Sequence, residues 1–161
     1  LGVVEYSEDY SQVTVADLPG LIEGAHANVG LGHEFLRHIE RTKVLCYVLD
    51  MSGEERRNPW DDYLILQDEL RRYNSEMLTR PSIIVANKMD AKESSRNLQQ
   101  FQFRINPSDE LKIIPISAKG RTNVEDVKKA LKETIQYHLN KAVIAGKETI
   151  KVKTVLPTSG L

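Results

Sequence analysis

The chain has 161 residues, of which 40% are hydrophobic and 28% charged, and its formal net charge is −1. This length predicts one hydrophobic core, and no apolar run reaches the roughly 18 residues of a membrane span. The single cysteine, Cys46, rules out an internal disulfide. Because it lies within an apolar run, we expect a buried, inert thiol rather than a nucleophile.

The first half of the chain predicts a hairpin, a glycine-punctuated segment, a helix and a buried strand. Residues 2–6 and 12–17 are strand-like and are joined by a polar turn, which is typical of an antiparallel hairpin. Residues 21–31 contain several glycines and are expected to be mobile. The apolar spacing of residues 33–42 predicts a helix, and the continuous apolar run at 44–50 predicts a buried strand.

The second half continues the alternation of helices and strands. Asn58 is predicted to cap a helix whose first residue is Pro59. The apolar stripe of that helix is expected to comprise Trp60, Tyr63, Leu64, Leu70 and Tyr73. A strand at 82–86, a helix near 93–103 and a strand at 113–116 follow. Residues 122–125 (Thr-Asn-Val-Glu) have the pattern of a capping box, which opens a long helix over 124–139.

Three polar motifs begin where predicted strands end. They are Asp17-Leu18-Pro19-Gly20, Asn87-Lys88-Met89-Asp90 and Ser117-Ala118-Lys119. In an open parallel α/β sheet, ligands bind outside the carboxyl ends of the strands. The sequence therefore predicts three ligand-binding loops at one edge of one sheet.

The second motif has the chemistry of a guanine-reading corner. The carboxylate of Asp90 can accept two hydrogen bonds, from N1–H and the exocyclic amino group of guanine. Adenine has no such donor pair, so discrimination on the order of 10⁴-fold is available. Asn87 can tie loops together, and the stem of Lys88 can lie along the base plane. The alternative is a polar turn after a buried strand.

The spacing of the three motifs resembles the third, fourth and fifth motifs of translation-factor-class GTPases. The block from Asp17 to Thr42, which contains Asp-Leu-Pro-Gly-Leu-Ile-Glu-Gly-Ala and Gly-Leu-Gly, is similar to the Obg family of ribosome-assembly GTPases. The resemblance spans roughly residues 1–139. His26 with Asn28 resembles eukaryotic, organelle-type members more than bacterial ones.

This resemblance implies a P-loop GTPase (Ras-like) fold, a mostly parallel sheet with helices on both faces. It also implies GTP or GDP and Mg²⁺ as ligands. Asp17 would hold Mg²⁺, through a water, and the Gly20 N–H would bond the γ-phosphate. Loss of that bond after hydrolysis would relax the following segment. Guanine would be read by Asn87, Lys88 and Asp90, and Ser117, Ala118 and Lys119 would close over the base, with the Ala118 N–H donating to O6.

The sequence contains no G-x-x-x-x-G-K-[ST] loop, which in such proteins cradles the phosphates. We therefore expect residues 1–139 to be the carboxyl-terminal part of a GTPase domain that is incomplete at its amino-terminal side and inactive alone. A missing central strand would leave unpaired backbone groups on both of its neighbours. The alternative is a degenerate relative that has lost nucleotide binding.

Residues 140–161 are expected to form a basic extension. Four lysines against one glutamate give this segment a net charge of +3, and residues 149–155 are compatible with a short strand. Binding to rRNA phosphate and simple solvation are both compatible with this composition.

No catalytic residue can be assigned. Leu21 follows Gly20, and an apolar side chain cannot orient the attacking water. Intrinsic hydrolysis should therefore be slow until a partner or a cation completes the site. The nearby histidines are more simply explained as solvated surface residues.

The resemblance implies a GTP-hydrolysing switch in assembly of the large ribosomal subunit, whose precursor would be the partner. We expect it in the mitochondrial matrix, with cytoplasm or chloroplast as alternatives. A non-hydrolysing docking module on a ribosomal particle is the alternative function, and Asp90 disfavours an ATPase.

Overall fold

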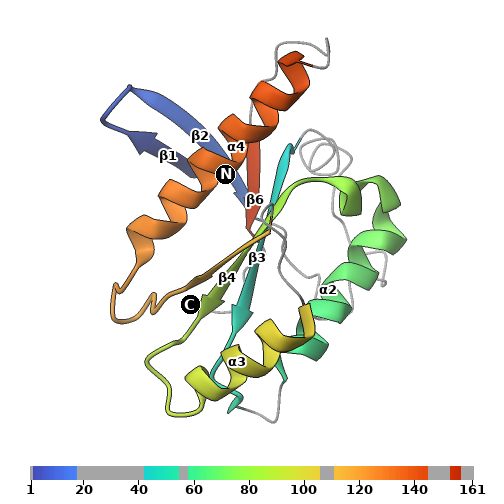
Figure 1. Cartoon of the computed structure of the whole chain (residues 1–161), viewed down its shortest axis with the longest axis vertical. Coiled ribbons are helices and arrows are strands. Elements are labelled where there is room, and N and C mark those ends of the chain that lie inside the picture. Colours follow the sequence, from blue (N-terminus) through green and yellow to red (C-terminus); the bar gives the residue numbers. More distant parts are fainter. Residues whose placement is uncertain (1, 18–41, 55–57, 106–110, 145–152, 157–161) are drawn as a thin grey trace.

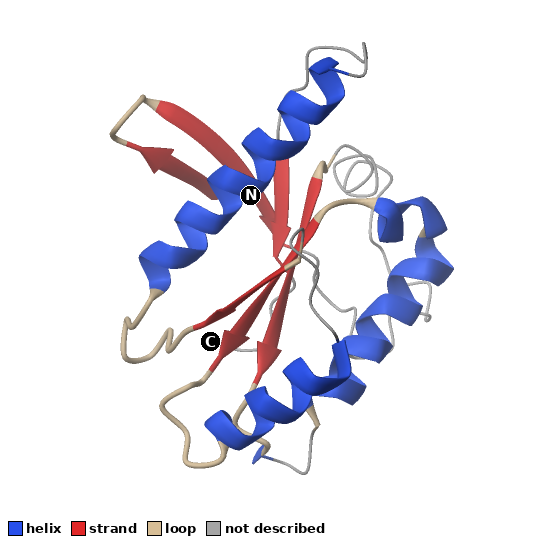
Figure 2. Cartoon of the chain, viewed as in Figure 1, coloured by secondary structure: helices blue, strands red, loops and turns tan. Residues whose placement is uncertain are grey.

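The computed structural model describes residues 2–17, 42–54, 58–105, 111–144 and 153–156, and within them six strands form one sheet with the order β1-β2-β6-β3-β4-β5. The strands are β1 (Gly2–Tyr6), β2 (Ser11–Asp17), β3 (Val44–Asp50), β4 (Ser82–Asn87), β5 (Lys112–Pro115) and β6 (Lys153–Leu156). The helices are α2 (Pro59–Tyr73), the 3-10 helix η2 (Ser75–Thr79), α3 (Ser94–Ile105) and α4 (Val124–Ile144). Every strand pair except β1–β2 is parallel, and helices cover both faces, which confirms the predicted mostly parallel α/β sheet (Figure 2).

The two faces of the sheet hold separate parts of the core, and α4 lies on one side while α2 and α3 lie on the other (Figure 1). Side chains alternate between the faces because successive residues of a strand point in opposite directions. Tyr47 and Ile84 pack with buried residues of α2 and α3, whereas Cys46 and Ile83 pack with Leu131 of α4. Cys46 is 1% exposed and burial raises the pKa of its thiol, which confirms the inert cysteine predicted from the sequence.

Helix α2 begins as its sequence predicts but turns a different stripe inward. The Asn58 side chain accepts a hydrogen bond from the Trp60 N–H at 2.9 Å, and Pro59 opens the helix. Leu66 is 1% exposed, whereas Leu64 is 45% exposed, so placing Leu64 in the buried stripe was wrong. The run from Tyr63 to Leu66 is apolar throughout, and periodicity within it does not select the inner face.

The β1–β2 hairpin has the predicted turn and is fastened to α4. The Tyr6 hydroxyl donates to the Lys128 carbonyl at 2.8 Å. The ammonium of Lys132 lies 2.8 Å from a carboxylate oxygen of Asp9 and 4.9 Å from the centre of the Tyr6 ring. The hairpin is therefore held by one helix side chain that contacts both its turn and its first strand.

Strand β6 lies between β2 and β3 near the centre of the sheet, whereas we expected a missing central strand to leave a gap. Residues 153–156 pair with Thr14–Asp17 of β2, and Thr154 and Val155 pair with Val44 and Leu45 of β3. Helix α4 also runs past residue 139 to Ile144. The division at 139/140 stays a prediction, but part of the basic segment belongs to the sheet.

Helix α4 starts at Val124 without the predicted capping box. Thr122 pairs through its backbone with Ser117, and Glu125 forms an ion pair with Lys128 at 2.7 Å. In a capping box the Glu125 carboxylate would accept from the Thr122 N–H. Because that N–H donates to the Ser117 carbonyl and the carboxylate pairs with Lys128, the capping-box prediction was wrong, although the helix start was right. Across the part of the chain that the structure describes, no helix is long and apolar enough to cross a membrane.

Candidate functional site

The carboxyl ends of β2, β4 and β5 lie at the same edge of the sheet. Asp17 ends β2, Asn87 ends β4 and Ser117 follows β5, and these strands run in one direction. The prediction that the three motifs begin at one edge of the sheet is therefore confirmed. Three strand spacings separate β2 from β4, about 14 Å at 4.7–4.9 Å each. A ligand with two distinct ends, such as a nucleotide, can span that edge.

Asn87 joins the second motif to the third. Its side-chain oxygen accepts hydrogen bonds from the Lys88 N–H at 2.7 Å and the Ala118 N–H at 3.0 Å. The prediction that Asn87 ties loops together is confirmed. The Ala118 N–H, which the family resemblance assigned to guanine O6, is directed to Asn87 in this structure, so its role toward the base stays a prediction.

Asp90 is held by the buried hydroxyl of Ser117. The Ser117 Oγ donates to Asp90 Oδ1 at 2.5 Å and accepts from the Gly120 N–H at 2.9 Å. This hydrogen bond, with weaker attraction from Lys119 and Lys88, holds the pKa of the exposed Asp90 carboxyl below its usual range. Asp90 is thus a fixed, ionised acceptor that faces solvent at neutral pH.

Backbone hydrogen bonds lock the same loops together. The Met89 N–H donates to the Ile116 carbonyl at 3.0 Å, and the Ile116 N–H donates to Ala86 at 2.8 Å. The Met51 N–H donates to the Asn87 carbonyl at 2.9 Å, so the end of β3 is included. Backbone hydrogen bonds within the chain therefore join the ends of β3, β4 and β5 into one corner.

Lys88 makes a contact that the sequence reasoning missed. Its ammonium lies 2.7 Å from Asp50 Oδ2 and 3.8 Å from a carboxylate oxygen of Glu54. Partial burial raises the pKa of Asp50, but hydrogen bonds from Lys88 and Ser52 outweigh burial, and the net pKa is lowered. The position of Asp50 could have indicated this contact, because Asp50 ends the buried strand β3 in the same way that Asn87 ends β4.

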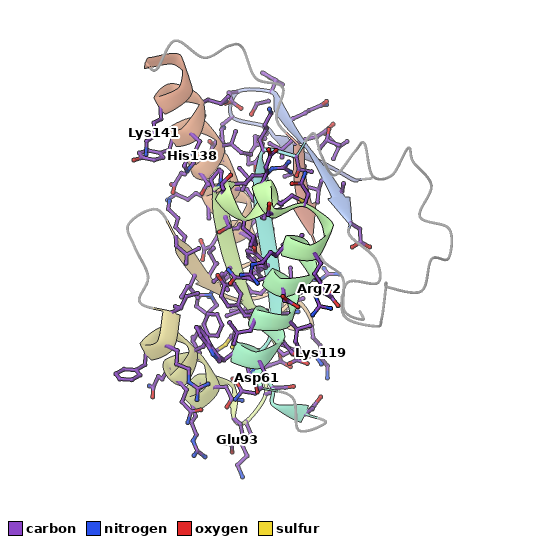
Figure 3. All side chains as sticks on the ribbon, turned by 90° about the vertical axis from the view of Figure 1, so that its right-hand side faces the viewer. Asp61, Arg72, Glu93, Lys119, His138 and Lys141 are labelled. Atoms are coloured by element: carbon purple, nitrogen blue, oxygen red, sulfur yellow. The ribbon has the colours of Figure 1, made fainter. Side chains whose placement is uncertain are left out.

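Of the remaining predicted residues, Lys119 of the third motif lies near this corner, whereas Asp17 of the predicted metal site lies at the β2 end of the sheet edge. Lys119 is exposed. In Figure 3 it lies far from His138 and Lys141, which belong to the carboxyl-terminal part of α4. Asp17 is half-buried at the end of β2. Within the described ranges no group of three or more metal-ligating side chains occurs. A single carboxylate still fits Mg²⁺, which typically takes one or two carboxylates and completes its shell with water and phosphate.

The first motif after Asp17 and the expected switch segment lie outside the described residues. This applies to Gly20, to Leu21, and to the helix predicted at 33–42 up to residue 41. It applies also to His26 and Asn28, on which the organelle-type comparison depends. Their predicted roles stay predictions.

The chain is similar in sequence to known GTPases. A family model described as 50S ribosome-binding GTPase matches residues 2–88. The GTPase Obg of Bacillus cereus (strain ATCC 14579) is 55% identical over 127 residues, which cover 79% of this chain and 29% of the relative. The GTPase Obg of Bacillus cereus (strain Q1) is 47% identical over 165 residues, covering all of this chain and 37% of the relative. That of Bacillus thuringiensis (strain Al Hakam) is 54% identical over 127 residues, again 79% of the chain and 29% of the relative.

The chain spans roughly a third of the length of these curated relatives, between 29% and 37%. The family model covers more than half of the chain, which confirms the predicted P-loop GTPase fold. Together, the family model and the identities to GTPase Obg show that the chain belongs to the Obg family of GTPases.

Proposed function

We propose that the protein to which this chain belongs is a GTP-binding and GTP-hydrolysing switch in assembly of the large ribosomal subunit. The observation that carries the proposal is the bonded corner in which Asn87 holds Ala118 and Ser117 holds Asp90. The description of the matching family, a 50S ribosome-binding GTPase, supports the ribosomal partner. A large-subunit precursor is the partner we propose.

The corner selects guanine through one carboxylate. Asp90 offers acceptor oxygens to the N1–H and amino group of guanine, and Ser117 fixes the carboxylate in place. Adenine has no donor pair on that edge and would leave the carboxylate unpaired. Such a mismatch is worth about 10⁴-fold in discrimination, and this argues against an ATPase.

The phosphate end of the nucleotide is assigned to the β2 end of the edge. Asp17 would hold Mg²⁺ through a water, and the ion would neutralise phosphate charge when bound. Gly20 would donate its N–H to the γ-phosphate, and loss of that hydrogen bond after hydrolysis would release the following segment. These roles follow from family membership and from the position of Asp17.

Slow hydrolysis by the protein alone is part of the proposal. Leu21 has neither donor nor acceptor, so it cannot orient water, and groups supplied by a partner can be worth orders of magnitude in rate. The same observation favours the second candidate, a docking module that binds GTP without hydrolysing it. We propose the mitochondrial matrix as the compartment, on the resemblance of His26 and Asn28, with cytoplasm and chloroplast as alternatives.

Substitution of Asp90, the carboxylate proposed to bind guanine, tests the proposal in the full-length protein. Asp90→Asn should weaken GTP binding and shift preference to xanthosine triphosphate, because an amide donor pairs with the xanthine oxygen. Competition binding of both nucleotides measures the shift, and Asp68→Asn on the exposed face of α2 is the matched control. Equal GTP affinity in Asp90→Asn and parent would contradict the guanine site.

Single-turnover hydrolysis with and without large-subunit precursors separates the two candidate functions. The particle should accelerate GTP hydrolysis by the switch, whereas the docking module should hydrolyse no GTP in either case.

A further inference from the structure

Lys88 has an unusual backbone for a lysine. Its φ is 64°, in the left-handed region that side chains other than glycine and asparagine rarely adopt. The conformation is maintained by contacts on both sides: the Lys88 N–H donates to Asn87 Oδ1, and the Lys88 carbonyl accepts from the Ala91 N–H at 3.0 Å. Strain of this kind persists only where the surroundings fix it, and it often accompanies function.

Asp50 is itself positioned before it meets the lysine. It lies opposite Asn87 in the β3–β4 register. Its Oδ1 accepts from the Ser52 N–H at 2.8 Å, and its Oδ2 faces the Lys88 ammonium at 2.7 Å. Each carboxylate oxygen therefore has its own donor, and the anion has a fixed place at the end of β3.

Of the two described carboxylates beside this lysine, Asp50 is the nearer and the more buried. The other acidic neighbour, Glu54, lies farther away at 3.8 Å and its side chain is 72% exposed, against 26% for Asp50. Screening weakens an exposed charge more than a partly buried one. The pair with Asp50 thus determines the direction in which the lysine stem extends along the sheet edge.

Directing that stem has a consequence for a flat ligand. A lysine has a flexible four-carbon stem, and fixing it in one rotamer loses conformational entropy. When a neighbouring anion fixes the stem beforehand, a ligand that lies on the stem no longer bears that loss, and its affinity rises. Asp50 does not need to contact the ligand to have this effect.

We infer that Asp50 is a positioning residue of the nucleotide site, which holds the stem of Lys88 extended as a platform for the guanine base. This inference rests on the proposed function, and it adds a side chain of β3 to a guanine-reading corner whose other side chains follow β4 and β5. The ion pair between Asp50 and Lys88 stays intact when nucleotide is bound, so nucleotide binding does not have to break it.

Binding of a fluorescent GDP analogue to the full-length protein tests the role of Asp50. Asp50→Asn removes the charge and keeps the shape, and it should weaken binding about threefold to fivefold, the range of a partly exposed ion pair of up to about 1 kcal/mol. The loss should shrink at high salt, because screening already weakens the pair. Asp50→Glu should restore part of the affinity. Asp68→Asn, which breaks a pair of the same 2.7 Å length with Arg72 on α2, should leave binding unchanged.

A double-mutant cycle separates positioning from a general effect on the fold. In a Lys88→Met background there is no ammonium to hold, so Asp50→Asn should cause no further loss of affinity. Additive losses, or tighter GDP binding by Asp50→Asn alone, would overturn the inference. A parent that binds GDP while Asp50→Asn binds it equally well removes only the role of Asp50. A full-length parent that binds no GDP removes the proposed function and this inference together.

Discussion

The sheet has two halves, β3–β4–β5 and β1–β2–β6, which differ in strand pairing and in burial. In the β3–β4–β5 half, six residue pairs join β3 to β4, and Ile83, Ile84 and Ala86 are completely buried. In the β1–β2–β6 half, Val3 is 58% exposed and Tyr10 91% exposed, and within the described residues β6 meets β3 over two residue pairs. Figure 1 shows the β1–β2 hairpin diverging from the other strands.

This difference follows the division of the proposed site. The base-reading corner, with Asn87, Asp90 and Ser117, lies on the densely packed half, whereas Asp17 lies on the other. A part that selects a ligand by geometry benefits from rigid support, while a part that responds to a phosphate must be able to move. The two-pair contact between β6 and β3 is where the halves join.

The largest expected effect comes from opening the core of the packed half. Phe101 is 1% exposed and stands edge-on to Tyr63 and Trp60, with ring centres 5.6 and 5.8 Å apart. Phe101→Ala should lower the free energy of unfolding by about 3–5 kcal/mol, measured by urea denaturation. Phe103→Ala, on the same helix but 90% exposed, should change it by less than about 0.5 kcal/mol. Similar losses for both variants would contradict the contrast in packing.

A smaller effect is expected from breaking the joint between the halves. Val155→Pro removes one backbone donor from a strand that pairs on both sides, and the loss should be about 1–3 kcal/mol. Hydrogen exchange should quicken at Thr14–Asp17 of β2 and at Leu45, and stay slow in β4. Val155→Ala, which keeps the donor, is the control for this ladder effect. Equal quickening in β4 would show that the halves unfold as one unit.

The smallest effect concerns the fastening of the hairpin to α4. A hydrogen bond from Lys132, with further bonds from Ser11, lowers the pKa of Asp9 to about 2. A lowered folded-state pKa means that this stabilisation is present above about pH 4 and is lost as the pH falls toward 2. Asp9→Asn should therefore lower the denaturation midpoint slightly near neutral pH, and the difference from the parent should shrink as the pH falls from 4 to 2 and below. Glu8→Gln, whose carboxylate is 3.9 Å from the same ammonium, should have less effect. A difference between Asp9→Asn and parent that does not shrink between pH 4 and pH 2 would exclude the ion pair as its cause.

Local patterns predicted most of the packed half. The strands over 44–50 and 82–86 and the cap at Asn58 were found where polarity changes sharply along the chain. The shared edge of the three motifs followed from parallel strand order, since each motif begins where a strand ends. Each of these features depends on residues that are close together in the sequence, so the local sequence pattern is enough to predict it.

The features that were missed depend on contacts between distant segments. The pairing of Asp50 with Lys88 requires the β3–β4 register, which no local pattern specifies. The inward turn of Leu66 rather than Leu64 depends on where the sheet lies relative to α2. The place of β6 within the sheet depends on edges supplied by β2 and β3.

The central position of β6 has a consequence for how the chain reaches its native state. Of the six described strands, β6 is the last to emerge during synthesis, yet it lies between two that emerge earlier. Pairing Thr14 with Lys153 closes a very long loop, and such distant contacts slow folding because the entropy of closure precedes any gain. Among the described strands, β6 is the one that covers the facing edges of β2 and β3, and open strand edges are the type of surface that invites aggregation. We therefore expect the pairing of β6 with β2 and β3 to form late in folding, after the contacts within the β3–β4–β5 half.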